Sequence, residues 1–259
     1  MKIFKLLIAH LLIVCSLSGA TLWTVIVADT LDDQIGEALE VDVMAMSRHV
    51  RKAAKYAKLD LRLFVFSGDK ANFEALADIL RIEPQPDDTI LFYWTGHGFR
   101  TLSKDKENNP WPNLHLGVEE AGIDHREITE MLASKGARLL ISISDCCNNY
   151  ISERWAPNTL SLLPKVWMSQ TMEENVAAQF GHLYRESRGI IVATGAEKGE
   201  FSFCNEQLGG FFTYFLLENI RKETQGQAPT SWDSIFFKTS KDVSGYSLTQ
   251  HPHYEISID

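Results

Sequence analysis

A histidine between two glycines and a pair of adjacent cysteines are the residues of this chain best suited to do chemistry. His97 stands in the run Thr-Gly-His-Gly (residues 95–98), and Cys147, 50 positions later, ends the run Asp-Cys-Cys (residues 145–147). Each run directly follows an apolar stretch of the kind that forms a buried strand. In an open α/β sheet, chemistry gathers at the carboxyl ends of the strands, where the imidazole and the thiol can meet. A thiol beside a base predicts nucleophilic acyl transfer.

The glycines around His97 favour a catalytic turn. Glycine lets the backbone bend sharply after a strand and approach a ligand closely. The amide of Gly98 can then point at a developing oxyanion, where a preorganised donor contributes about 3 kcal/mol. The alternative is a histidine in a glycine-rich turn that has no catalytic task.

The two cysteines differ in their expected roles. Cys147 follows a strand at the start of a new element, where backbone amides and a nearby imidazole favour the thiolate. Cys146 points the opposite way and fits the usual behaviour of a free cysteine as a small buried hydrophobe. A metal site that combines both with His97 is disfavoured, because adjacent cysteines lack the usual intervening residues. The sequence therefore predicts Cys147 as the nucleophile and no metal.

Acidic residues near the same strand ends predict a site for a cation. A carboxylate at Asp145 would raise the pKa of the thiol, since like charges repel. Its better use is to attract an Arg or Lys side chain of a substrate. Asp29, after the first strand, can supply a second carboxylate. The alternative, about equally favoured, is that Asp29, Asp32 and Asp33 form a solvated acidic loop.

Composition bounds the function classes. The formal charge of −9 argues against a nucleic-acid partner, because phosphates would be repelled. Three cysteines, at positions 146, 147 and 204, remain after residue 20, and three cannot all pair within the chain. At least one free thiol is therefore expected. No pattern in the sequence specifies an oligomeric state.

The first twenty residues have the pattern of a secretion signal. Lys2 and Lys5 form a positive start, residues 6–17 are apolar, and Ser-Gly-Ala at residues 18–20 offers small side chains for cleavage. The apolar run is short for a membrane span. We expect a signal peptide over residues 1–20, export, no stable membrane span after cleavage, and a single domain over residues 21–259. A retained anchor is the alternative.

Alternating strand and helix patterns follow, and they predict an α/β fold with a mainly parallel central sheet and helices on both faces. The expected strands are 22–28, 59–66, 89–94, 138–144 and 189–194, and the expected helices are 37–58, 71–80, 124–133 and 211–220. Residues 103–113 are polar with two prolines and predict a surface loop. Residues 150–188 predict either a helix around 172–184 or a mobile functional loop.

Together these motifs resemble the caspase-like cysteine peptidases, especially the metacaspase and bacterial orthocaspase branch. That family has Ser/Thr-Gly-His-Gly after one strand and Asp-x-Cys after the next, and the interval of 50 residues fits it. Ala-Thr-Gly-Ala at residues 193–196 and Gly-Gly-Phe-Phe-Thr at residues 209–213 are similar to its later strand and helix. The sequence departs from the family near Asp29, where the usual Asn-Tyr is lacking.

The resemblance implies a cysteine endopeptidase of caspase-like fold, with a protein or peptide substrate that carries Arg or Lys at P1. Cys147 would be the nucleophile and His97 the general base and acid. The amides of Gly98 and Cys147 would form the oxyanion hole, and Asp145, Asp29 and Thr95 would line the S1 pocket. No cofactor is implied. Calcium activation occurs in parts of this family, but no acidic loop here has a diagnostic ligand spacing.

Two other functions remain as alternatives. A catalytically silent member of the same fold would bind a peptide or protein, although such members commonly lose either the histidine or the cysteine. A phospho-receiver-like signalling domain would use the acidic residues after the first strand together with Asp145, but the adjacent thiol disfavours it.

Overall fold

The computed structural model describes residues 19–116, 122–150 and 173–259. Its centre is a six-stranded sheet in the order β11-β8-β7-β3-β1-β2. The strands are β1 (Thr21–Ala28), β2 (Asp60–Ser67), β3 (Thr89–Thr95), β7 (Leu139–Asp145), β8 (Gly189–Thr194) and β11 (His253–Ile258). All neighbours are parallel except β11, which runs antiparallel to β8. The mainly parallel sheet predicted from the sequence is confirmed.

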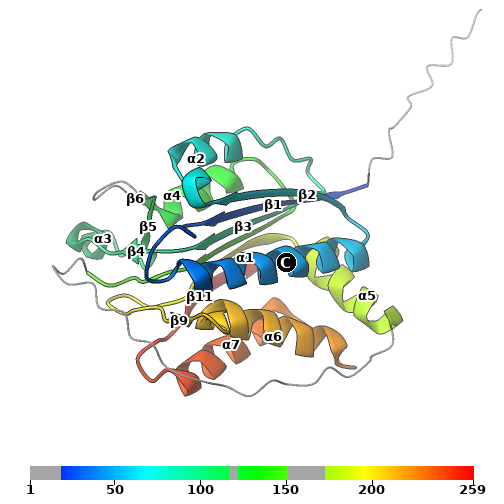
Figure 1. The fold of residues 1–259 in the computed structure, drawn as a ribbon. Helices are drawn as coiled ribbons and strands as arrows, with labels where there is room; N and C mark the ends of the chain where they lie inside the picture. The colour runs from blue at the N-terminus through cyan, green and yellow to red at the C-terminus, as the bar shows by residue number, and fades with distance from the viewer. Residues whose placement is uncertain (1–18, 117–121, 151–172) are drawn as a thin grey trace, which may run out of the picture.

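Helices cover both faces of this sheet (Figure 1). On one face lie α1 (Gly36–Ala57), α5 (Glu173–Gly181), α6 (Phe211–Gln225) and α7 (Trp232–Tyr246), and on the other lie α2 (Phe73–Ile79) and α4 (His125–Ala133). Two apolar clusters fill the spaces between the layers. Every residue of β3 and β7 is buried, as expected for central strands covered on both faces.

Smaller elements gather at the carboxyl end of the parallel strands, where Figure 1 shows them clustered. A three-stranded antiparallel sheet contains β4 (Gly98–Phe99), β5 (Asn113–His115) and β6 (Gly122–Asp124), and β9 (Cys204–Asn205) pairs with β10 (Gly209–Gly210). The short helix α3 (Leu102–Lys106) lies beside the first group, and a single 3-10 turn (Gly68–Lys70) follows β2. These elements surround the ends of β3 and β7.

The surface loop expected at residues 103–113 is wrong in two respects. The segment contains most of α3, and it buries Lys104, Asn109 and Trp111. Lys104 and Asn109 bind the same carboxylate, that of Asp124, at 2.7 and 2.6 Å. Two polar residues of this segment therefore belong to a buried network, although Ser103, Lys106, Glu107 and Asn108 are exposed.

Other sequence predictions have mixed outcomes. Asp124 caps α4 as predicted, because its side chain accepts a hydrogen bond from the Arg126 amide at 2.8 Å. Within 150–188, α5 continues into a π-helical turn, His182–Glu186, so the helix alternative holds there, while residues 151–172 lie outside the described part. The helix α7 and the strand β11 were not anticipated.

The predicted signal peptide lies almost wholly outside the described residues, which begin at Gly19. Within the described ranges, no helix has both the length and the apolar character that a membrane crossing requires. Export and cleavage near Ala20 stay predictions, as does the single domain over residues 21–259.

Candidate active site

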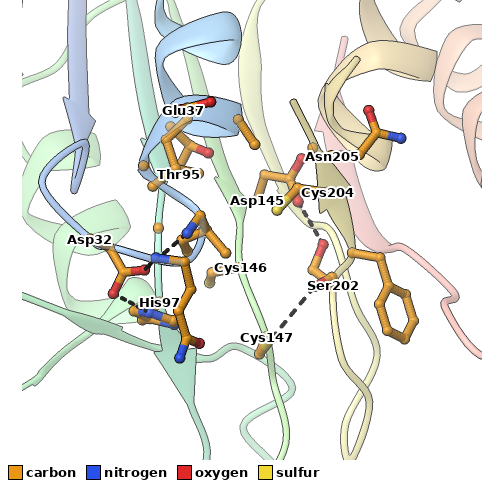
Figure 2. A pocket seen from close by; sticks show the side chains of 18 of the residues that line it. Asp32, Glu37, Thr95, His97, Asp145, Cys146, Cys147, Ser202, Cys204 and Asn205 are labelled. Carbon is orange, nitrogen blue, oxygen red and sulfur yellow. Dashed lines mark hydrogen bonds and ion pairs between the residues drawn. The ribbon is translucent and has the colours of Figure 1, made fainter. Parts of the chain in front are cut away.

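The two predicted catalytic motifs leave the sheet side by side. β3 and β7 are neighbours, and their register pairs Thr95 with Asp145, the residues that end the two strands. The amide of Gly96 donates to the carbonyl oxygen of Asp145 at 3.3 Å, so the chains stay together as they leave the sheet. His97 and Cys147 both line one pocket beyond these strand ends (Figure 2). The two residues that the sequence singles out thus line the same pocket.

Gly98 is the point of closest approach between the two motifs. A β-carbon at this position would lie 2.5 Å from Cys146 Sγ and 2.5 Å from the carbonyl oxygen of Cys147. Any larger residue would push the histidine loop away from the cysteine loop, so the glycine is required by space rather than by its backbone angles. The short distance between the loops also brings the Gly98 backbone next to the nucleophile candidate.

The adjacent cysteines occupy different environments, as the sequence predicts. Cys146 is 2% exposed and packs in the apolar cluster between the sheet and α2 and α4. Cys147 is partly exposed, and its thiol donates to the carbonyl oxygen of Ser202 at 3.6 Å. Burial, together with the nearby Asp145, raises the pKa of Cys147 to about 11. The resting nucleophile candidate is therefore a protonated thiol at neutral pH, and the thiolate expected from the sequence is not its resting form.

His97 is held by the carboxylate of Asp32, a residue that one of two equally favoured sequence interpretations placed in a solvated loop. Nε2 of His97 lies 2.9 Å from Asp32 Oδ2, and both side chains are about one-fifth exposed, at 21% and 23%. Asp32 belongs to the connection between β1 and α1. Its other oxygen, Oδ1, accepts hydrogen bonds from the amides of Gln34 and Ile35 at 2.8 and 3.0 Å. The loop that precedes α1 thus fixes a carboxylate against the imidazole.

Two buried acidic residues lie next to one another near the pocket, and Asp145 is the one that lines it. Asp145 is 5% exposed and accepts hydrogen bonds from Ser202 Oγ at 2.6 Å and from the amide and hydroxyl of Thr213 at 2.9 and 2.7 Å. Asp42, on α1, is 0% exposed and accepts from Thr95 Oγ1 at 2.8 Å and from the Gly210 amide at 2.9 Å. A β-carbon on Gly210 would lie 2.1 Å from Asp145 Oδ2 and 3.1 Å from Asp42 Oδ2.

The two carboxyl groups therefore share the space around Gly210, and the electrostatics of the pair are unusual. Burial, and next the charge of Asp145, raises the pKa of Asp42 well above its ordinary value, and burial raises the pKa of Asp145. Among the described residues, neither carboxyl group belongs to an ion pair. Two buried acids without a cation hold a proton tightly, and they offer a strong site to a cationic side chain that displaces it.

The three residues that the sequence predicts for an S1 pocket differ in their position relative to this pocket. Thr95 and Asp145 both line the pocket, whereas Asp29 is not among its lining residues. The Asp29 amide donates to the Thr95 carbonyl at 3.3 Å, which ties this residue to the β3 end before the chain turns toward the pocket. Asp42 does not line the pocket either, but its carboxyl group is the one that lies beside Asp145. The signal for it was its position on the buried stripe of α1, in register with Leu39 and Met46.

A buried arginine joins the segments that follow the two motifs. Arg100 is 2% exposed; its Nη1 donates to Asn148 Oδ1 at 3.3 Å, and its Nε donates to Asp105 Oδ1 at 2.9 Å. Its amide also donates to the carbonyl oxygen of Asn149 at 2.8 Å. Because Arg100 follows His97 and Asn148 follows Cys147, this side chain links the two reactive loops. Sequence patterns gave no indication of it.

Comparisons with known proteins agree with this geometry. The sequence matches the family model described as the caspase domain over residues 37–258. The fold is similar to the crystal structure of caspase-1 from Spodoptera frugiperda, with a TM-score of 0.55 and 12% sequence identity over 92% of this chain and 86% of that one. No curated protein matches the sequence significantly. The caspase-like fold expected from the two motifs is confirmed.

Proposed function

The chain belongs to the caspase-domain family and is a cysteine-type endopeptidase, and we propose that it cleaves proteins after arginine or lysine by means of Cys147 and His97. The observation that carries the proposal is the arrangement of one pocket. His97 and Cys147 line it from neighbouring strand ends, and Asp145, which lines the same pocket, has the buried carboxyl group of Asp42 beside it. The preference for a basic P1 residue is that of the metacaspase branch, which the motifs resemble.

In the proposed reaction, His97 takes the proton of the Cys147 thiol while the sulfur attacks the scissile carbonyl carbon. The carbonyl π electrons move to the oxygen, and we assign the amides of Gly98 and Cys147 to stabilise that oxyanion. The C–N bond then breaks, the leaving amine takes the proton from His97, and a thioester remains on Cys147. Water hydrolyses the thioester with His97 as base, which restores the thiol.

The high pKa of the resting thiol fits a substrate-dependent activation. At neutral pH a thiol with a pKa of about 11 is almost entirely protonated, so the free enzyme holds little thiolate. Proton transfer to His97 then accompanies attack instead of preceding it. A bound peptide supplies the electrophile and excludes water from the pocket, and both effects favour the transfer.

The acidic pair explains the proposed P1 preference. A P1 guanidinium or ammonium group that enters between Thr95 and Gly210 would meet Asp145, with Asp42 directly behind. It would replace the shared proton by a fixed positive charge, so the carboxylates would both ionise. An aspartate at P1 would instead bring a third negative charge, which such a site rejects.

The decisive experiment compares the two cysteines on peptide reporters that carry Arg at P1. We expect Cys147→Ala to abolish cleavage and Cys146→Ala to retain most of it, because Cys146 is buried in the apolar cluster whereas Cys147 is partly exposed beside the pocket. His97→Ala should also lose cleavage. Equal losses from the two cysteine variants, with both proteins folded by circular dichroism, would contradict the assignment of the nucleophile.

A further inference from the structure

The imidazole of His97 has a neighbour that the two-residue mechanism does not use. Asp32 Oδ2 lies 2.9 Å from His97 Nε2, within hydrogen-bond distance. Figure 2 shows the Asp32 side chain directed at the histidine from the loop before α1. The contact joins residues 65 positions apart in the sequence, so it depends on the fold and not on local chain geometry.

The carboxyl group of Asp32 is held in its ionised form. Burial alone would raise its pKa, but hydrogen bonds from the Gln34 amide, from His97 and from the Ile35 amide outweigh burial and lower the pKa. The pKa of nearby Asp29 is instead raised, mainly by burial and then by the charge of Asp32. Of Asp29 and Asp32, Asp32 is thus the one that presents a fixed negative charge to the imidazole.

We propose that Asp32 is the positioning residue of His97, so that the catalytic unit is Cys147, His97 and Asp32. This inference rests on the proposed peptidase function and deepens it. An ionised carboxylate can only accept hydrogen bonds, so Nε2 of His97 must carry a proton. In the neutral ring the basic nitrogen is then Nδ1, which takes the proton of the Cys147 thiol. Asp32 fixes this tautomer and the ring orientation and stabilises the imidazolium that forms.

The geometry of the loop makes Asp32 well suited to this role. Its Oδ1 is engaged by two successive amides, and its own carbonyl oxygen accepts from the Gly36 amide at 2.9 Å. The carboxylate therefore approaches His97 from a backbone turn that is already fixed by α1. Other titratable groups near His97 are Asp29 after β1, His115 on β5, whose ring centroid lies 6.3 Å from that of His97, and Cys147 after β7. Of these groups and Asp32, it is Asp32 whose carboxylate lies within hydrogen-bond distance of His97 Nε2.

Asp32→Asn is the sharpest test, because asparagine can keep the loop while reversing the polarity toward His97. Its side-chain oxygen can still accept from the Gln34 and Ile35 amides, but its NH₂ group then faces Nε2 and favours the wrong tautomer. We expect kcat for an Arg reporter to fall about 10²- to 10⁴-fold, with KM changed less than about threefold and the melting temperature retained. Asp32→Ala should lose kcat as well. Glu40→Gln, which removes an exposed carboxylate of α1 outside the pocket, is the matched control and should keep both constants.

A second measurement covers the case in which Asp32→Asn loses stability. Nitrogen-15 NMR of the wild-type histidines, assigned with His97→Gln, should show His97 protonated at Nε2 at neutral pH. A neutral ring protonated at Nδ1 would overturn the proposal, and so would a folded Asp32→Asn enzyme with kcat within about threefold of wild type. If Cys147→Ala and His97→Ala still cleave the reporter, the peptidase assignment itself fails. If they are inactive and Asp32→Asn is not, only the role of Asp32 fails.

Discussion

At the scale of single residues, Asp42 is the side chain whose role can be isolated most cleanly. Asp42→Asn keeps an oxygen for Thr95 Oγ1 or the Gly210 amide but removes the charge behind the P1 site. We expect KM for an Arg reporter to rise about 10- to 100-fold, since removing one of two buried charges that face a cation costs a few kcal/mol. Steady-state kinetics on paired reporters measures this.

The control for Asp42 is built into the substrate. Citrulline has nearly the shape of arginine but carries no charge, so a citrulline reporter should be cleaved slowly and at a similar rate by wild type and by Asp42→Asn. An equal loss on both reporters would mean that the substitution distorts the pocket, and it would contradict a charge-based P1 selection.

The residues of this site differ in how visible they are in the sequence. His97, Thr95, Asp145 and Cys147 stand directly after strongly apolar strands, so strand periodicity and sheet topology together predict that they meet. The same patterns do not identify Asp32, because the sequence around a loop carboxylate does not differ between one that is solvated and one that binds a histidine. Its contact with His97 is a property of the loop conformation, for which the sequence has no periodic signal.

At the scale of elements, Arg100 makes the histidine and cysteine loops one unit. Arg100→Ala would remove the buried donor to Asn148 Oδ1 and to the Asn109 carbonyl oxygen, while Asp105 keeps Tyr150 and Lys198. We expect a loss of about 1–3 kcal/mol in the free energy of unfolding. Activity should fall in the folded fraction too, because the loop after Cys147 loses its link to the loop after His97. Urea denaturation and steady-state kinetics measure the two effects.

Arg100→Lys and Arg126→Ala provide the matched comparisons. Lysine keeps the charge but cannot donate in the fork geometry that reaches both Asp105 and Asn148, so it should recover only part of the stability. Arg126 bridges Glu107 at 3.1 Å on the surface, and its loss should cost less than about 1 kcal/mol. Similar losses of unfolding free energy for Arg100→Ala and Arg126→Ala would show that the buried hydrogen bonds of Arg100 stabilise the protein no more than a surface ion pair does.

The sequence predicts the long periodic elements more accurately than the short polar segments. The buried strands β3 and β7 and the long helix α1 carry clear periodic patterns, and their predicted bounds lie within one residue of those observed. The segment at 103–113 was misjudged in part, since Lys104 and Asn109 bind the Asp124 carboxylate in the interior instead of facing water. The caspase-domain family and its fold replace the receiver-like alternative, which the acidic residues after β1 had also allowed.

At the scale of the whole molecule, a buried histidine ties stability to pH. His125, at the start of α4, is 0% exposed and hydrogen-bonds with Ser142 and Ser144 of β7 at 2.9 and 3.1 Å. Burial lowers its pKa from 6.5 to about 3, against an opposing pull from Asp124. The folded state thus binds fewer protons than the unfolded state. Its contribution to stability is complete above pH 6.5 and is lost as the pH falls from there toward 3.

We expect this single group to account for a loss of about 2 kcal/mol in the free energy of unfolding between pH 7 and pH 5. His125→Gln should reduce the slope of unfolding free energy against pH by up to one proton in that range, whatever its effect on stability at pH 7. Urea denaturation at several pH values measures the slope. Equal slopes of unfolding free energy against pH for wild type and His125→Gln would show that His125 does not link stability to pH.

The raised pKa of the Cys147 thiol has a consequence for how the protein reacts with small oxidants and alkylating agents. Peroxides and simple alkylating agents consume thiolates, and a sulfur with a pKa of about 11 presents almost none at neutral pH. The free enzyme should therefore survive oxidants that inactivate peptidases with ionised resting cysteines. Inhibitors that resemble a bound peptide should label it much faster than iodoacetamide does. The Cys147 thiol would therefore become reactive only when a polypeptide binds in the pocket.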